Sequence, residues 1–369
     1  MKIAIVYDWI DRWGGVERLL LEIHRMFPKA DFFTSAVDLH KASWAKQLTI
    51  RTSFLQALPD FIKESRIASL PFYPFSFETL SFDRYDTVIS VTSSFAKSII
   101  TKPQTKHICI LLTPSRYLYL YPHAFEERMP LFFLSPYFSY MRRWDRIAAQ
   151  RPDHIISISR EVARRCKKYY QRESQVIYPP FDLDYWKEIK NSLSAQSRLV
   201  SQDINNYYLA VSRLEPYKKI DLAINAFNRL PQSKLIIVGK GSLLTHYKSI
   251  ARENTIFFRD VDDSQLAALY INAKALIMTQ EEDFGYASVE AQFFGCPVVA
   301  YGKGGALETV AEGKTGVFFP HQTSDSLIAT LERFDKIAYN FRYGMRNTGY
   351  ELAQKFRTEV FVKKLKQIV

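Results

Sequence analysis

Two carboxylates in the second half of the chain have the type and spacing of groups that bind a hydroxylated, anionic ligand. Glu282 and Glu290 are separated by seven residues, and the segment Phe284–Ala287 lies between them. An ionised carboxylate accepts charge-assisted hydrogen bonds from hydroxyl groups, and the free N–H groups at a helix N-terminus suit a phosphate. Alternatively, these acidic residues do no more than complement the dipole of the helix.

A basic block precedes this acidic one. Arg213 and Lys218 follow the apolar run Tyr207–Val211 and come before a helical pattern. A guanidinium fork and a lysine ammonium at such a turn could neutralise a diphosphate leaving group. The other interpretation is ordinary surface charge at the end of a strand.

Glycines are placed where backbone could approach a ligand closely. The chain has 13 glycines, and none lies between Gly15 and Gly239. Gly14 and Gly15 follow the apolar run Ile3–Tyr7, and the segment Gly302–Gly305 follows another such run; each opens a helical pattern. Both segments are candidates for a nest of backbone amides that binds an anion.

Short apolar runs rich in β-branched residues alternate with amphipathic patterns, and these are the elements that must position the site. The strand candidates are Ile3–Tyr7, Thr87–Val91, Ile108–Leu112, Ile155–Ile158, Val176–Tyr178, Tyr207–Val211, Leu235–Val238, Ala275–Met278 and Val298–Tyr301. The helix candidates include Glu17–Met26, Asp221–Arg229, Ser264–Asn272 and Leu327–Phe334. The alternation occurs twice, which predicts an α/β protein with two doubly wound, Rossmann-like domains.

The polar, weakly periodic segment 186–206 predicts a linker between these domains. We therefore expect an N-terminal domain over residues 1–185 and a C-terminal domain over residues 207–348. The remaining residues, 349–369, predict a final helix without a following strand, which could cross back to the first domain.

Composition excludes several classes of protein. The chain has 369 residues, hydrophobic residues make up 47% of it, and it contains no apolar run of about 18 residues that would span a membrane. Three scattered cysteines predict neither a disulfide framework nor a zinc site, and they favour a reducing, cytoplasmic compartment. No Walker sequence and no dinucleotide fingerprint is present. The 7 histidines show no spacing typical of metal ligands, so we expect no bound metal.

Positive charge is concentrated in residues 101–172. This segment has 14 Lys/Arg and 5 Asp/Glu, a surplus of 9 out of the net charge of +12. It also holds the aromatic run Pro130–Phe138 and the triplet Arg142-Arg143-Trp144. Basic residues beside exposed aromatics favour an anionic membrane surface, which would make the protein peripheral at the inner membrane face. The alternatives are a nucleic-acid surface, which we do not predict as a partner, and core aromatics beneath a solvated basic face.

Taken together and in this order, these blocks resemble glycosyltransferase family 4, a group of nucleotide-sugar-dependent enzymes with the GT-B architecture. The family pattern of two glutamates seven residues apart, with Phe-Gly after the first, is matched by Glu282, Phe284, Gly285 and Glu290. Further matches are Gly295–Ala300, Gly304-Gly305, Ser212–Leu214 with Lys218, and Val176–Pro180. The resemblance covers nearly the whole chain.

The resemblance implies two Rossmann-like domains facing each other across a cleft, an acceptor side in the first and a nucleotide-sugar site in the second. It implies that Glu282 accepts hydrogen bonds from the donor sugar and that Arg213 and Lys218 stabilise the departing diphosphate without a metal or other cofactor. Glu290 would hold the ribose. Donor binding would also involve Gly14, Gly15, Phe284, Gly285, Tyr286 and Ala287. Transfer would retain the anomeric configuration.

The chain departs from the family pattern in the segment Leu112–Tyr117. The family has His-Thr-Pro, one residue, and Arg-Tyr, whereas this chain has Leu112 at the histidine position. That histidine usually faces the transferred sugar, so its loss bears on the turnover rate or on the donor. Arg116 and Tyr117 match the pattern and are acceptor-side candidates. Two glycines common in the family are also replaced, by Lys219 and Arg259.

The sequence therefore predicts a retaining, metal-independent hexosyltransferase of polysaccharide or glycolipid biosynthesis. The expected donor is a nucleoside diphosphate sugar, with GDP-mannose favoured, and the expected acceptor is a glycan or a polyprenyl-diphosphate-linked glycan. An alternative is a catalytically silent member that binds a nucleotide sugar and supports a partner enzyme. An epimerase or phosphorylase of the same fold is a third class, but we find no additional acid–base pair and no Schiff-base lysine site that would indicate one.

Overall fold

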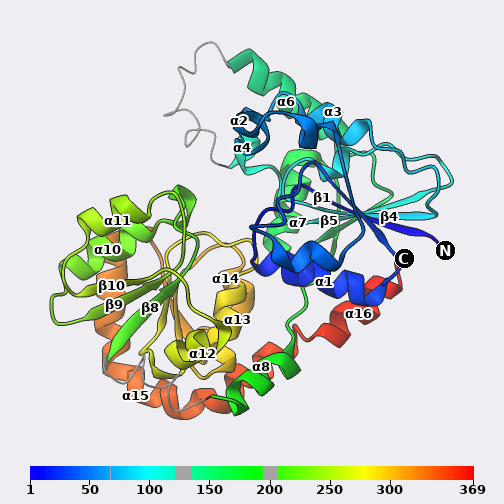
Figure 1. The fold of residues 1–369 in the computed structure, drawn as a ribbon. Helices are drawn as coiled ribbons and strands as arrows, with labels where there is room; N and C mark the ends of the chain where they lie inside the picture. The colour runs from blue at the N-terminus through cyan, green and yellow to red at the C-terminus, as the bar shows by residue number, and fades with distance from the viewer. Residues whose placement is uncertain (67, 121–134, 194–205) are drawn as a thin grey trace. The chain divides into compact units, whose positions relative to one another are not determined.

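The computed structural model describes residues 1–66, 68–120, 135–193 and 206–369 (Figure 1). The chain divides into two compact units, unit 1 with Met1–Pro180 and Phe361–Val369, and unit 2 with Phe181–Val360. The prediction of an α/β fold with two Rossmann-like domains is confirmed, because each unit is built on its own parallel sheet covered by helices.

Unit 1 contains a seven-stranded sheet with the order β3-β2-β1-β4-β5-β6-β7, in which all neighbours are parallel. Its strands are β1 (Ile3–Tyr7), β2 (Asp31–Thr34), β3 (Ile50–Thr52), β4 (Thr87–Thr92), β5 (Lys106–Leu111), β6 (His154–Ser157) and β7 (Gln175–Val176). The central strands β1 and β4 are buried on both faces, as expected for a parallel sheet between helix layers.

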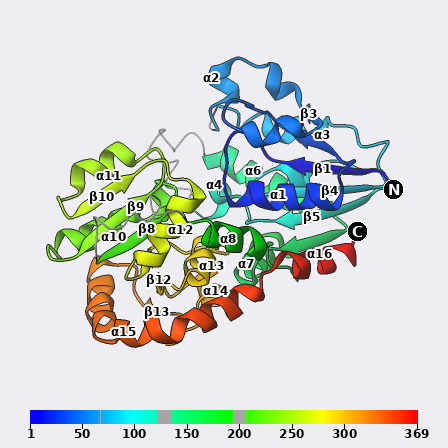
Figure 2. The ribbon, with the colours of Figure 1, turned by 60° about the horizontal axis from the view of Figure 1, so that its bottom comes forward.

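The helices of unit 1 form two layers (Figure 2). They are α1 (Gly15–Met26), α2 (Asp60–Lys63), α3 (Tyr73–Glu78), α4 (Arg116–Tyr119), α6 (Ser135–Ala148) and α7 (Arg160–Tyr170), with short 3-10 turns at η1 (Ser43–Gln47), η2 (Phe54–Ala57) and η3 (Ala96–Ser98). Residues of α3, α4 and α6 pack with β1 and β4 in one apolar cluster. On the opposite face, α1 contacts the sheet through the edge-to-face pair His24–Phe32.

Unit 2 contains a six-stranded parallel sheet with the order β10-β9-β8-β11-β12-β13. Its strands are β8 (Tyr207–Val211), β9 (Lys234–Val238), β10 (Thr255–Phe258), β11 (Leu276–Met278), β12 (Val298–Tyr301) and β13 (Gly316–Phe319). The strand order reverses between β8 and β11. In doubly wound folds this switch point is where ligands bind.

Helices cover both faces of this second sheet. They are α8 (Leu183–Asn191), η5 (Pro216–Lys218), α10 (Ile220–Asn228), α11 (Leu244–Ile250), α12 (Asp263–Asn272), α13 (Tyr286–Phe293), α14 (Ala306–Thr309) and α15 (Ser324–Gln354). Apolar residues of α10, α11 and α15 form the main core with alternate residues of the strands. On the other face, the Tyr207 hydroxyl donates to the Leu269 carbonyl of α12 at 2.8 Å.

Two of the differences from the sequence expectation concern the two ends of unit 2. The segment expected to begin the linker instead forms α8, because Trp186 is an apolar anchor that is fully buried against Phe181 and Phe294. The final helix expected over residues 349–369 is in fact two elements. The first is the end of α15, and the second is α16 (Thr358–Lys366). The chain returns to unit 1 at Phe361.

Candidate active site

The two turns singled out in the second half of the sequence meet at the switch point of unit 2. One turn follows β8 and carries Lys218, and the other follows β11, the neighbouring strand, and carries Glu282. The Thr279 hydroxyl donates to the Lys218 carbonyl at 3.0 Å, and the Gln322 amide donates to the Thr279 carbonyl at 2.8 Å. The first bond holds the two turns together, and the second ties the turn after β11 to the segment after β13.

Lys218 and Glu282 form an ion pair there. The Lys218 Nζ donates to Glu282 Oε1 at 2.6 Å, and the two side chains are 13% and 16% exposed. The Gln280 side-chain amide donates to the same carboxylate oxygen. A cation and a carboxylate are thus held side by side in a largely buried setting, although they stand 64 residues apart in the chain.

Arg213 lies on the same turn as Lys218 and is exposed. Its Nη2 donates to the Tyr217 hydroxyl, and its guanidinium carbon is 5.8 Å from the Tyr217 ring centroid. The Lys218 Nζ is 5.5 Å from the same ring. Tyr217 therefore lies against both basic groups, and it orients the arginine without neutralising its charge.

The N-terminus of α13 follows Glu282 directly. Gly285 is the N-cap residue with φ of 95°, and no side chain caps the helix. Phe284 is buried and packs edge-to-face against Tyr286 and Phe356, which fixes the turn that leads into the helix. Tyr286 and Ala287 are the first residues of α13, so their backbone N–H groups belong to the first turn, whose N–H groups have no acceptor within the helix itself.

The glycine segment after β12 supports the Glu282 turn. The Gly305 N–H donates to the Glu282 carbonyl at 2.7 Å. A Cβ at Gly304 would stand 2.5 Å from that carbonyl oxygen, and one at Gly305 would stand 2.7 Å from the Phe284 backbone. Only glycine permits this approach. At least one amide of the expected nest is thus used within the protein.

Glu290 is placed further along α13 and is 6% exposed. The Tyr270 hydroxyl of α12 donates to its Oε2 at 3.0 Å. This carboxylate is therefore held by the fold before any ligand arrives. Its assignment to a ribose stays a prediction.

The glycines predicted in unit 1 lie at the start of α1. Gly14 is the N-cap residue, Gly15 is the first residue of the helix, and no side chain caps it. Asp8, which follows β1 directly, is fully buried. Its carboxylate accepts hydrogen bonds from the Thr92 hydroxyl and from the backbone N–H groups of Ser93, Phe95 and Ala96, at 2.7–2.9 Å. These bonds lock the segment after β4 to the end of β1.

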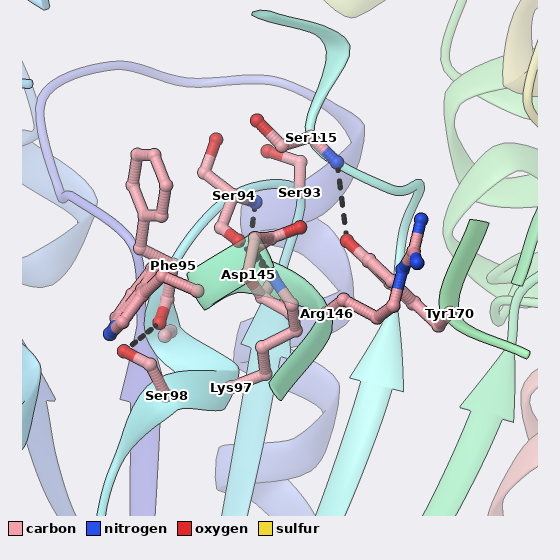
Figure 3. Close-up of polar contacts among 12 residues, drawn as sticks. Ser93, Ser94, Phe95, Lys97, Ser98, Ser115, Asp145, Arg146 and Tyr170 are labelled. Carbon is pink, nitrogen blue, oxygen red and sulfur yellow. Dashed lines mark hydrogen bonds and ion pairs between the residues drawn. The ribbon is translucent and has the colours of Figure 1, made fainter. Parts of the chain in front are cut away.

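A buried ion pair supports the same segment (Figure 3). Lys97 donates to Asp145 of α6 at 2.5 Å and to the Ser94 carbonyl, and the two charged side chains are 2% and 0% exposed. Beside it, the Ser115 N–H donates to the Tyr170 hydroxyl at 3.4 Å. The nearby Asp145 charge adds to burial in raising the pKa of Tyr170 well above its usual range.

The segment that departs from the family pattern follows β5 directly. Leu112 is buried, whereas Arg116 and Tyr117 are half-buried at the start of α4. Burial raises the pKa of Tyr117 to about 12. Of the aromatic run over residues 130–138, the part up to residue 134 lies outside the described residues.

Comparison with known families decides the assignment. A family model described as Glycosyltransferase Family 4 matches residues 13–185, and one described as Glycosyl transferases group 1 matches residues 192–351. This chain belongs to the group 1, family 4 type of glycosyltransferases.

Relatives of this glycosyltransferase are distant. An uncharacterised 41.2 kDa protein in the cps region of Klebsiella pneumoniae is 26% identical over 79% of this chain and 80% of its own length. An alpha-1,3/1,6-mannosyltransferase of Dictyostelium discoideum is 24% identical over 56% of this chain, and the match spans only 58% of that enzyme. Anabaena HepE, solved in complex with UDP and glucose, shares the fold, with a TM-score of 0.73 and 20% identity over 100% of this chain and 99% of that one.

Sequence reasoning missed several residues of the candidate site of this glycosyltransferase. Gln280 and Tyr217, which contact Glu282 and the two basic residues, carry no motif of their own. They could have been identified only by their positions next to motif residues at the ends of strands. Within the described residues, no helix is both long and apolar enough to span a bilayer.

Proposed function

We propose that this glycosyltransferase transfers a hexose from a nucleoside diphosphate sugar to a hydroxyl group of a glycan or a polyprenyl-diphosphate-linked glycan. In this proposal, transfer retains the anomeric configuration and needs no metal ion. The observation that carries the proposal is the 2.6 Å contact of Lys218 with Glu282 beside the N-terminus of α13. It places a cation suited to a diphosphate next to a carboxylate suited to sugar hydroxyls.

The proposed mechanism is electrostatic. Negative charge develops on the diphosphate as its bond to the sugar breaks, and groups positioned in advance stabilise this charge. Lys218 and Arg213 would supply two positive charges, and the first-turn N–H groups of α13 would donate to phosphate oxygens. Glu282 would accept a hydrogen bond from the sugar. The leaving phosphate would help to deprotonate the acceptor on the same face, so that no carboxylate nucleophile is required.

The relatives favour two donors. The mannosyltransferase relative supports mannose as the transferred sugar, for which the sequence prediction is GDP-mannose. The complex of HepE with UDP and glucose makes UDP-glucose the second donor to test. The acceptor is proposed from the family resemblance alone.

A ligand screen followed by a product assay tests the proposal. A ligand at 100 times its Kd stabilises the protein by about 2.7 kcal/mol, which corresponds to a rise in Tm of about 5 to 10 °C for a domain of this size. We expect one nucleotide sugar to stabilise the protein in EDTA and to be consumed there. NMR of the product reads its anomeric configuration. Turnover that requires added Mg²⁺, or an inverted product, would contradict the corresponding part of the proposal.

The buried Leu112 supports a second candidate, a silent member that binds the donor without turnover. It has no group that could hydrogen-bond the sugar, unlike the histidine of the family pattern. Stabilisation by a nucleotide sugar without hydrolysis or transfer, and gain of turnover in Leu112→His, would favour this second function.

A membrane surface is also proposed, and it involves α6. Tyr140 and Ile147 of this helix are 58% and 56% exposed, and the basic residues Arg143 and Arg146 are exposed on it too. An exposed face that combines apolar and basic side chains suits the interface of an anionic bilayer.

Liposome flotation tests this surface. We expect binding to vesicles that contain phosphatidylglycerol, weakening with salt, and loss of most of that binding in Tyr140→Ser combined with Ile147→Ser. Ile271→Ser on α12 of unit 2 removes another exposed apolar side chain and serves as the control. If the control and the double variant bind the vesicles equally, a surface other than α6 binds the membrane.

A further inference from the structure

A half-buried charged cluster in unit 1 has no role in the site described above. The Arg66 guanidinium carbon is 4.0 Å from the centroid of the Trp9 ring, and its Nη2 donates to the carboxylate of Asp11. Asp11 also accepts from the Arg12 Nε at 2.8 Å and Nη2 at 3.0 Å. Trp9 and Asp11 follow β1, whereas Arg66 comes from the connection between α2 and α3, 55 residues from Asp11.

This cluster lies at the carboxyl edge of the first sheet, where parallel α/β sheets bind ligands. Tyr117, which follows β5, is close enough to Arg66 for the positive charge of the arginine to oppose the rise in its pKa. The same holds for Tyr73 of α3, whose ring also packs against Trp9 at 5.8 Å. The guanidinium is thus surrounded by aromatic side chains, with the hydroxyls of two tyrosines nearby.

Arg66 shares its counter-ion with Arg12, which is also close to the Glu17 carboxylate. Two guanidinium groups share the single Asp11 carboxylate, and the side chains of Arg66 and Asp11 are 19% and 25% exposed, so both remain within reach of a ligand. A guanidinium has five N–H donors in a fixed planar fork. Stacking on Trp9 holds that plane in one orientation. A rigid, partly desolvated fork that shares its counter-ion with a second arginine is suited to an anion with two or more oxygens, such as a phosphate.

We infer that Arg66 binds a phosphate group of the acceptor, with Trp9 holding its guanidinium in place. This inference rests on the proposed function, since it concerns the acceptor of that reaction. The phosphate could belong to the diphosphate of a polyprenyl carrier or to a phosphorylated sugar. Asp11 competes with this phosphate for the same guanidinium.

That competition allows a test with effects of opposite sign. In Arg66→Met the fork is lost, and we expect the affinity for inorganic pyrophosphate to fall by about tenfold to a hundredfold. In Asp11→Asn the competing anion is removed, and we expect the affinity to be unchanged or higher. Arg25→Met removes the charge of an exposed arginine on α1 and is the control for net charge.

Isothermal titration measures these affinities. The titrations use inorganic pyrophosphate, glucose 1-phosphate and undecaprenyl diphosphate in detergent micelles. Binding at unit 2 cancels in each comparison with wild type, so the test stands whether or not a nucleotide sugar proves to be the donor. Arg66→Lys keeps the charge but lacks the planar fork, and its affinity for pyrophosphate should be about tenfold lower than that of wild type. This variant replaces Arg66→Met in the test if Arg66→Met folds poorly.

The outcomes separate the explanations. Loss in Arg66→Met and retention in Asp11→Asn support a phosphate site, and the probe that binds most tightly identifies its source. Equal loss in both variants would mean that the Arg66–Asp11 pair only holds the loop after β1, and it would overturn the inference. Absence of binding by wild type to all three probes would overturn it as well.

Discussion

From the contact between Lys218 and Glu282 we predict different effects of substitution on the free energy of unfolding and on kcat. Both side chains are largely buried, and the pair lies between the exposed and the fully buried case. Loss of one partner costs about 0–1 kcal/mol at a surface and about 3–5 kcal/mol in an interior. We therefore expect Lys218→Ala and Glu282→Ala each to lower the free energy of unfolding of unit 2 by about 1–3 kcal/mol. The double variant should lose less than the sum, with a coupling of about 1–2 kcal/mol.

The effect on catalysis should be larger for Lys218→Ala than its effect on stability implies. Removal of one positioned group that stabilises developing charge lowers kcat by about 100-fold to 1000-fold. The control is Lys274→Ala, because Lys274 forms a 2.6 Å ion pair with Asp335 and lies 4.9 Å from the Tyr208 ring, in the same unit. This control should lose stability but keep the kcat of wild type.

Urea unfolding and initial-rate assays with the donor from the ligand screen measure the two effects. If folded Lys218→Ala keeps kcat within about threefold of wild type, Lys218 does not stabilise the leaving group. A rise in KM alone would show that it binds the ground state and the transition state equally. Additive losses in the double variant would mean that the two side chains are not coupled in solution, contrary to their distance.

Two further predictions concern unit 1, and a third concerns unit 2. Lys97→Met should destabilise the protein by about 3–5 kcal/mol in urea unfolding, because it leaves the buried Asp145 carboxylate without its cation; a loss under 1 kcal/mol would contradict this. Burial lowers the pKa of His107 from 6.5 to about 3. As the pH falls below 6.5 the unfolded chain therefore binds a proton that the folded chain does not. The free energy of unfolding then decreases, by up to about 2 kcal/mol at pH 5. In His107→Gln, urea unfolding should show a decrease in the free energy of unfolding between pH 6.5 and pH 5 that is smaller by this amount. Tyr270→Phe should weaken donor binding in the thermal-shift assay if Glu290 contacts the donor, whereas unchanged binding would leave Glu290 a structural role.

Most strands and helices near the site could be predicted because they depend on local patterns. The runs at Ile3–Tyr7, Tyr207–Val211 and Val298–Tyr301 are apolar on both faces, and each forms the strand expected from it. The long final helix was harder, since the pattern over Leu327–Phe334 continues without a break into the segment assigned to a separate helix. Where α15 ends and α16 begins depends on tertiary contacts such as the Phe181 N–H donating to the Phe356 carbonyl at 2.7 Å.

Contacts within the site were less predictable than the elements that carry it. The spacing of Glu282 and Glu290 indicates one helix terminus, but it does not tell which cation lies opposite. Lys218 reaches Glu282 because β8 and β11 are neighbours in the sheet, which is a property of topology. Arg66 was missed for the same reason, because its partners Trp9 and Asp11 are close only in the folded chain.

The two units use the same topological position for different purposes. In unit 1 the strand order reverses between β1 and β4, and in unit 2 it reverses between β8 and β11. A carboxylate joins the strand ends in each case. Asp8 is saturated by backbone N–H and hydroxyl donors and is fully buried, so a ligand could take its place only by breaking the fold. Glu282 is instead held by the side chains of Lys218 and Gln280, which can rotate to new partners. A site that binds and releases a charged donor requires contacts of this exchangeable kind, so we propose that the donor binds at Glu282 in unit 2, whereas Asp8 gives rigid support to the strand ends of unit 1.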